Sequence, residues 1–253
     1  MRTLWTFGCS FTAEYYPVGH PTIKSTYDDY KKWKGYLPEI WPTLLGEKLN
    51  YRVENKGKGG DSNYGILDQF FSCHHLIKES DIVIFGWTNV IRFKAANPLI
   101  NQFNQLLPAQ FDCYQDTGMS VKTIEEIFIN RTNSLWLGEV ANWITFINSF
   151  MEKSKINVYH WTSDENIFNN DSNFVDKSRF IITPHSHDTP KMLLGYLSQP
   201  HYYDGQYKAK IIEETNGEIN DCHFGEYGHI PQSEYFYNHI MNNIQHPTNE
   251  SRN

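Results

Sequence analysis

The stretch SDIVIFGW, residues 80–87, has the clearest strand pattern in the chain. A polar start is followed by an unbroken run of apolar residues. A strand that is apolar on both faces is typical of a parallel sheet that helices cover on both sides. Shorter apolar runs predict further strands at 3–7 (TLWTF), 51–54 and 155–162 (KINVYHWT), and 179–183 is a weaker candidate.

Segments with helical spacing lie between and after these strands. Apolar residues recur every three or four positions over 38–49, 66–77, 122–153 and 228–243. Pro38 falls in the first turn of the first segment, where its missing N–H costs nothing. Strands that alternate with helices predict an α/β fold, a three-layer α/β/α sandwich around a mainly parallel sheet.

Length and composition narrow the classes of function. A chain of 253 residues, 40% hydrophobic and 20% charged, buries a substantial core as one domain or at most two. We expect a single domain over 1–253, with long loop insertions at about 90–121 and 163–220. The formal net charge of -7 argues against nucleic-acid binding. No segment reaches the roughly 18 apolar residues of a membrane helix, and no signal peptide is visible. We therefore expect a cytoplasmic protein without membrane contact, of cellular or viral origin.

The cysteines and histidines form no metal-binding pattern. The four cysteines lack C-x-x-C spacing, so reduced thiols are the default. The eleven histidines include no H-E-x-x-H, and pairs such as His74-His75 bring no acidic ligands at useful spacing. We expect neither a metal nor a cofactor.

Polar loops follow three of the predicted strands, and a fourth precedes the last helix. They are GCSFT at 8–12, NKGKGGDSN at 55–63, GWTN at 86–89 and NDCH at 220–223. In a parallel sheet, ligands bind at the carboxyl ends of the strands. We therefore expect these four loops to meet at one edge.

Together the loops contain the groups that acyl transfer requires. Ser10 is a candidate nucleophile, and His223 is a candidate base for its hydroxyl proton. Asp221 is placed to orient the imidazole of His223. Candidate donors for the oxyanion are the backbone N–H groups of Ser10 and Gly60 and the side-chain amide of Asn89.

The order and spacing of these loops resemble the four blocks of the SGNH (GDSL-like) hydrolase superfamily, which contribute a Ser, a Gly, an Asn and a His with an Asp shortly before it. NKGKGGDS matches the second block most closely. Three positions depart from the pattern: Cys9 stands where Asp is commonest, two residues separate Gly86 from Asn89 where one is usual, and one residue separates Asp221 from His223 where many members have two. The resemblance implies a flavodoxin-like α/β/α fold and hydrolysis or transfer of an ester-linked acyl group.

Each of these residues also has an ordinary structural explanation. A lone serine after a strand is usually a turn residue, and a Gly-rich loop is flexible or binds phosphate, although this one lacks the G-K-[ST] ending of a P-loop. Asn89 is a possible turn or cap residue, Asp221 and His223 a possible cap and surface histidine. Cys9, next to Ser10, fits packing better than nucleophilic attack.

Several functions therefore stay open from the sequence. One is an esterase or deacylase acting on a small-molecule or carbohydrate ester, with Tyr15 and Trp87 among the aromatic residues that line its groove. The others are an O-acyltransferase with the same residues, a non-catalytic binding or structural protein on the same fold, and a magnesium-nucleotide protein. The sequence does not indicate the oligomeric state.

Overall fold

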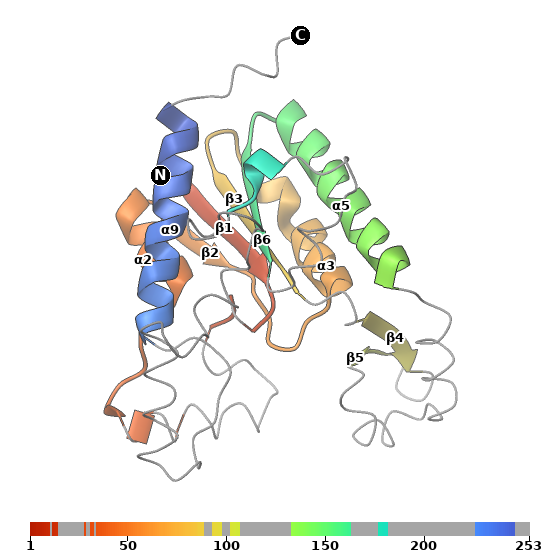
Figure 1. The fold of residues 1–253 in the computed structure, drawn as a ribbon, viewed down its shortest axis with the longest axis horizontal. Coiled ribbons are helices and arrows are strands. Elements are labelled where there is room, and N and C mark those ends of the chain that lie inside the picture. The colour runs from red at the N-terminus through yellow and green to blue at the C-terminus, as the bar shows by residue number, and fades with distance from the viewer. Residues whose placement is uncertain are drawn as a thin grey trace.

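Four parallel strands form the central sheet of the protein in this computed structural model (Figure 1). The structure describes residues 1–10, 12–14, 28, 31–32, 34–88, 93–97, 102–106, 133–162, 177–181 and 226–245. The strands are β1 (Thr3–Gly8), β2 (Arg52–Asn55), β3 (Ile82–Trp87) and β6 (Asn157–Thr162). Their order in the sheet is β2-β1-β3-β6. The predicted α/β fold with a parallel sheet is confirmed.

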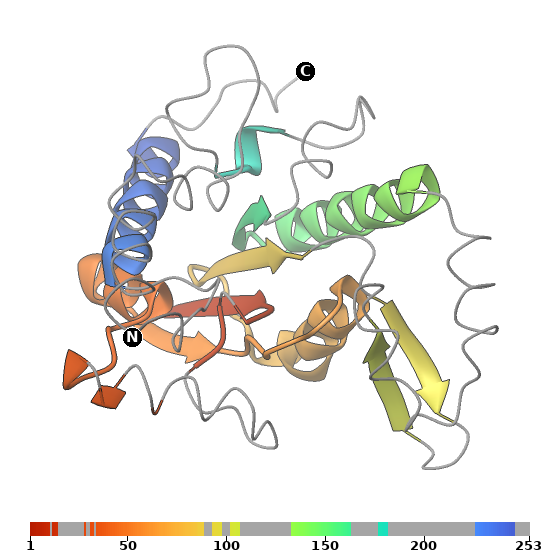
Figure 2. The ribbon, with the colours of Figure 1, turned by 60° about the horizontal axis from the view of Figure 1, so that its bottom comes forward.

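Helices cover both faces of the sheet. The helices α2 (Trp41–Leu49) and α9 (Glu226–Gln245) lie on one face, and α3 (Asn63–Cys73) and α5 (Asn133–Lys153) lie on the other (Figures 1 and 2). The three layers follow from the sequence, because strands that are apolar on both sides need helices on both sides. Within the described ranges, no helix is long and apolar enough to cross a membrane.

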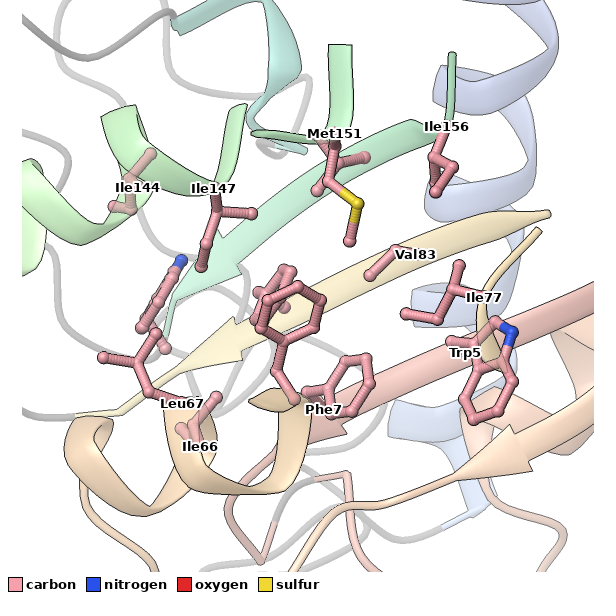
Figure 3. Close-up of a cluster of buried hydrophobic side chains, with 14 of the residues drawn as sticks. Trp5, Phe7, Ile66, Leu67, Ile77, Val83, Ile144, Ile147, Met151 and Ile156 are labelled. Atoms are coloured by element: carbon pink, nitrogen blue, oxygen red, sulfur yellow. The ribbon is translucent and has the colours of Figure 1, made fainter. Parts of the chain in front are cut away.

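Aromatic rings fill the core between the sheet and α3. Phe7 and Phe85, on neighbouring strands, stack with ring centroids 5.2 Å apart, and Phe70 of α3 packs against them at 5.7 and 5.4 Å. Figure 3 shows the aliphatic side chains that complete this core: Ile66 and Leu67 from α3, and Ile144, Ile147 and Met151 from α5. Burial of a side chain of this size stabilises the fold by about 1.5–3 kcal/mol.

The opposite core fixes the direction of α9. Trp41, Trp161 and Phe236 form its centre, with Phe236 at 4.7 Å from Trp41 and 6.0 Å from Trp161 between ring centroids. The backbone N–H of Trp41, at the start of α2, donates to Nδ1 of His229 at 3.2 Å. Lys48, near the end of α2, pairs with Glu234.

These two contacts align α2 and α9 in the same direction. Because α2 connects the parallel strands β1 and β2, it runs opposite to the strands and begins at their carboxyl edge. The helix α9 therefore also begins at the carboxyl edge and ends at the amino edge, where β1 starts (Figure 1).

Asp81 holds the amino edge of the sheet together. Its buried carboxylate accepts hydrogen bonds from the backbone N–H of Thr3 at 2.9 Å, Nε1 of Trp5 at 3.1 Å and the backbone N–H of Lys78 at 3.0 Å. The starts of β1 and β3 are thereby joined through one side chain.

The structure corrects several predicted boundaries. The first helix begins at Trp41 rather than residue 38, with Pro42 in its first turn. The second begins at Asn63 rather than residue 66, because Ser62 caps it, and a short 3₁₀ helix, η1 (His74–Leu76), follows its end. Of the helical segment predicted at 122–153, the part before residue 133 lies outside the described residues.

A hairpin occupies part of the first predicted loop insertion. The strands β4 (Phe93–Asn97) and β5 (Gln102–Leu106) pair antiparallel, and the hairpin lies beside α3 (Figure 2). Of the weak strand candidate at 179–183, Phe180 forms a single parallel bridge to His160, directly after the 3₁₀ helix η3 (Lys177–Arg179). Residues 182 and 183 lie outside the described residues.

Candidate functional site

A tight turn follows β1 and contains the predicted nucleophile. The carbonyl of Cys9 accepts hydrogen bonds from the backbone N–H groups of Thr12 at 2.9 Å and Ala13 at 3.0 Å. Ser10 lies inside this turn and is partly exposed, whereas Cys9 and Thr12 are buried. The turn therefore places Ser10, a partly exposed residue, just beyond the end of β1.

Gly8 permits the close packing of this turn. A Cβ atom at Gly8 would lie 2.3 Å from Oγ1 of Thr12, well inside van der Waals contact. The turn folds back over the last residue of β1 because that residue has no side chain.

The loop after β2 packs directly against the turn. A Cβ atom at Gly57 would lie 2.7 Å from the backbone N of Ala13, so the two backbones touch at this glycine. The backbone N–H of Lys58 donates to the carbonyl of Gly8 at 2.9 Å. The side chain of Asn55 donates to the carbonyl of Thr12 at 2.7 Å. The segments around Ser10 and Gly57 are thus held side by side.

Gly60 ends this loop in a left-handed conformation, with φ of 73°, and a Cβ atom there would meet nothing within 4 Å. Gly60 is partly exposed. A residue with positive φ and open space on its side-chain side suits a backbone N–H that has to approach a ligand.

The start of α3 anchors the chain directly after Gly60. The side chain of Ser62 accepts from the backbone N–H of Gly65 at 3.3 Å, which is an N-cap. Asp61 lies against Gly65, where a Cβ atom would be 1.7 Å from its Oδ1, and accepts from the amide of Gln69. The same Gln69 amide bonds to both the N–H and the carbonyl of Gly8, each at 3.4 Å.

The end of β3 is fixed by Asn63. Its Oδ1 accepts from the backbone N–H of Thr88 at 2.8 Å, and its Nδ2 donates to the carbonyl of Thr88 at 2.9 Å. Both residues are buried. The side-chain amide therefore pairs with the backbone as a neighbouring strand would.

These contacts converge at the topological switch point of the sheet. The chain runs from β1 to β2 on one side and then crosses to β3 on the other. Sheets of this kind bind ligands outside the carboxyl ends of the two strands that flank the switch point, here β1 and β3, and this position is called the crevice below. Ser10 follows β1, Gly60 lies in the loop after β2, and Thr88 follows β3.

Trp87 lies in the core rather than in a groove. It has no exposed surface, stacks on Phe85 at 5.4 Å, and donates from Nε1 to Nδ1 of His160 at 3.1 Å. Burial and the nearby Arg179 lower the pKa of His160 to about 3, so His160 is neutral and accepts this hydrogen bond. This position does not support the predicted contact of Trp87 with a substrate.

Four of the predicted site residues, Asn89, Asp221, His223 and Tyr15, lie outside the described residues. The structure brings the other two, Ser10 and Gly60, to the same edge. The roles of these six residues stay predictions. Glu226, the first residue of α9, lies three positions after His223, and α9 begins at the carboxyl edge.

Three supporting side chains were not among the predicted site residues. Asn55, Asn63 and Gln69 each use a side-chain amide to hold a backbone segment at the carboxyl edge. Two of them lie in the quoted stretch NKGKGGDSN. The sequence shows these two as polar residues at the two ends of a loop, which was the available signal for a supporting role. It does not show their partners Thr12 and Thr88, which lie far away in the chain.

In the part of the chain that the structure describes, Cys9 is buried and the histidines belong to no metal-binding group. Cys9 is a free thiol, 1% exposed, on the α2 and α9 side of the sheet, which confirms that it packs beside the turn. Among the described residues, no group of three or more His, Cys, Asp or Glu side chains is arranged to hold a metal ion.

No protein-family model and no curated protein matches the chain. Among solved structures, the chain is similar to a protein of Desulfitobacterium hafniense DCB-2 described as lipolytic and of the G-D-S-L family, with 13% identity, a TM-score of 0.32, and coverage of 94% of this chain and 99% of the other. It is also similar to the protein YxiM of Bacillus subtilis, with 14% identity and a TM-score of 0.44, over 98% of this chain and 57% of the other.

A third similar structure is that of a carbohydrate esterase whose active site is described as having divergent catalytic and non-catalytic binding functions. It has 8% identity and a TM-score of 0.42, over 95% of this chain and 64% of the other. The chain thus spans less than two thirds of the length of YxiM and of this esterase. All three similarities are to solved structures of low sequence identity, and the parallel sheet that the sequence predicts is shown by the strand pairing of this structure itself.

Proposed function

We propose that the protein is a serine hydrolase that cleaves an ester-linked acyl group. The observation that carries the proposal is the joined pair of loops at the β1–β3 crevice, which places the partly exposed Ser10 beside the loop that ends at Gly60. Such an arrangement suits a nucleophile that attacks a carbonyl group while backbone N–H groups bind the developing oxyanion.

In the proposed reaction, Oγ of Ser10 attacks the acyl carbon and its proton passes to His223. The tetrahedral oxyanion is bound by the N–H groups of Ser10 and Gly60 and by the amide of Asn89. His223 then protonates the leaving alcohol, and water releases the acyl group from Ser10 in the reverse sequence. Asp221 orients the imidazole.

The direction of α9 supports the role of His223. Three peptide units span at most about 11 Å between Cα atoms, and α9 begins at the carboxyl edge. An α9 that ran in the opposite direction would begin at the amino edge and would count against the proposed role of His223. We further propose a small-molecule or carbohydrate ester as the substrate.

The proposal is tested by hydrolysis of p-nitrophenyl acetate. We expect the wild type to be active and Ser10→Ala and His223→Ala to lose activity by on the order of a thousand-fold or more. Matched controls are Ser72→Ala and His75→Ala, which change residues at the far end of α3 and in η1, away from the crevice. A fluorophosphonate probe should label Ser10 and no other serine.

Two results would contradict the proposal. One is wild-type hydrolysis that survives in Ser10→Ala; the other is a wild type that neither hydrolyses the ester nor reacts with the probe, which would favour a binding protein on this fold. Release of the acyl group to an added alcohol in preference to water would identify an acyltransferase instead.

A further inference from the structure

The side chain of Asn55 makes every hydrogen bond that a carboxamide can make. Its Oδ1 accepts from Oγ1 of Thr6 and from the backbone N–H of Gly57, both at 3.0 Å. Its Nδ2 donates to the carbonyl of Thr12 at 2.7 Å and to Oε1 of Glu14 at 3.3 Å. A carboxamide has two acceptor positions and two N–H donors, so all four are occupied.

These bonds join two segments that are 43 positions apart in the chain. Thr12 belongs to the turn that contains Ser10, and Gly57 begins the loop that ends at Gly60. Asn55 bonds to both segments at once, while Gln69 joins their neighbours Gly8 and Asp61. The backbones also touch at Gly57, so a small shift of either segment changes the contact between them.

We propose that Asn55 is a positioning residue that sets the distance between the Ser10 hydroxyl and the Gly60 N–H. This inference rests on the proposed function and deepens it. A nucleophile and an oxyanion donor on different loops need to be held to within a fraction of an ångström, because a displacement of about 1 Å costs on the order of a hundred-fold in rate.

The variant Asn55→Asp tests this inference with almost no change in shape. Its carboxylate still accepts from Thr6 and Gly57, but it places an oxygen against the carbonyl of Thr12. We expect kcat for the ester to fall by on the order of ten- to a hundred-fold, with KM within about two-fold of the wild type. Protonation of the new carboxyl restores one donor, so the ratio of variant to wild-type kcat should rise toward acidic pH.

The matched control is Asp81→Asn, the converse substitution at the opposite edge of the same sheet. It disturbs the bonds to Thr3, Trp5 and Lys78 and lowers the melting temperature, but it leaves the carboxyl edge unchanged. Asn243→Asp, near the end of α9, repeats the substitution on a part-buried hydrogen bond to the carbonyl of His239 and serves as a second control if Asp81→Asn folds poorly. We expect both controls to keep the wild-type kcat.

A wild-type kcat in Asn55→Asp, or an equal loss in the folded control, would overturn the inference. Hydrogen exchange separates this outcome from a failure of the proposed function, because it needs no substrate. The Lys58 amide, which donates to the carbonyl of Gly8 across the two segments, should exchange about ten-fold or more faster in Asn55→Asp than in the wild type. Unchanged exchange would show that Asn55 does not hold the loop, whatever the activity of the protein.

Discussion

Single residues at the carboxyl edge set the geometry that the proposed chemistry needs, and glycines do so in two different ways. Gly57 is required by space, because the turn after β1 lies where its side chain would be. Gly60 is required by backbone conformation, because its φ is 73° and the space around it is open. The sequence predicts both as loop glycines but does not distinguish these reasons, because the distinction depends on a segment more than forty positions away.

The two reasons predict different costs for the same substitution. Gly60→Ala should destabilise the fold by only about 1–2 kcal/mol, the cost of a left-handed conformation for a residue with Cβ. Gly57→Ala should cost about 1–3 kcal/mol from overpacking and should also separate the two segments. Urea unfolding measures the stability, and hydrogen exchange at the Lys58 amide measures the separation. Faster exchange in Gly60→Ala than in Gly57→Ala would contradict this explanation.

At the scale of elements, the sequence predicts the strands well and the ends of the helices poorly. The apolar runs at 80–87 and 155–162 are confirmed as β3 and β6 because burial on both faces leaves a strong local signal. The start of α3 was predicted three residues late, because the cap is formed by Ser62 inside a loop rich in glycine. The hairpin of β4 and β5 was predicted as loop, since its polar residues show no clear alternation.

The position of the Trp87 side chain was also predicted wrongly from the sequence. It was predicted to line a groove, but residues at i and i+2 of a strand share a face. Phe85 lies in the core toward α3, so Trp87 does too. The contact of its indole with His160 depends on the pairing of β3 with β6, which no local pattern contains.

The packing of β6 predicts a loss of stability in acid. The pKa of His160 is lowered to about 3 in the native state by burial, against about 6.5 in the unfolded chain. Above pH 6.5 neither state binds the proton, so the stability is complete. As the pH falls from about 6.5 toward 3, the unfolded chain binds a proton that the native state excludes, and the free energy of unfolding falls by up to about 1.4 kcal/mol per pH unit.

Urea unfolding between pH 4 and 8 measures this loss. His160→Gln keeps a donor and an acceptor for Trp87 and Asn148 but does not titrate, so its stability should depend less steeply on pH than that of the wild type. Burial also lowers the pKa of His239, which adds a loss in the same direction to both proteins. Equal pH slopes in the two proteins would refute the assignment to His160.

On the scale of the whole molecule, the last helix completes a core that starts with the first strand. Leu4 of β1 and Phe236 of α9 belong to the same buried cluster, together with Trp41 and Trp161. The sequence predicts the helix and its apolar side, but its direction relative to α2 emerges only from the contacts of His229 and Glu234. The predicted site depends on that direction, because His223 lies three positions before Glu226, the residue at which α9 begins at the carboxyl edge.

This dependence predicts a large effect for one ring of α9. Phe236→Ala should lower the free energy of unfolding by about 3–5 kcal/mol, because it removes a fully buried ring between two tryptophans. Ile244→Ala on the same helix changes a side chain that is 46% exposed and should cost about 0.5 kcal/mol or less. Denaturant titrations followed by tryptophan fluorescence compare the two, and similar losses would show that α9 does not close the core.

The amino edge, where β1 starts and α9 ends, lies opposite to the crevice. A linker attached before residue 1 would leave the molecule on the side away from Ser10, which is also the side where α9 ends. Tethering the protein to a sensor chip or a fusion partner through such a linker would therefore present the carboxyl edge, with Ser10 and Gly60, to the solution.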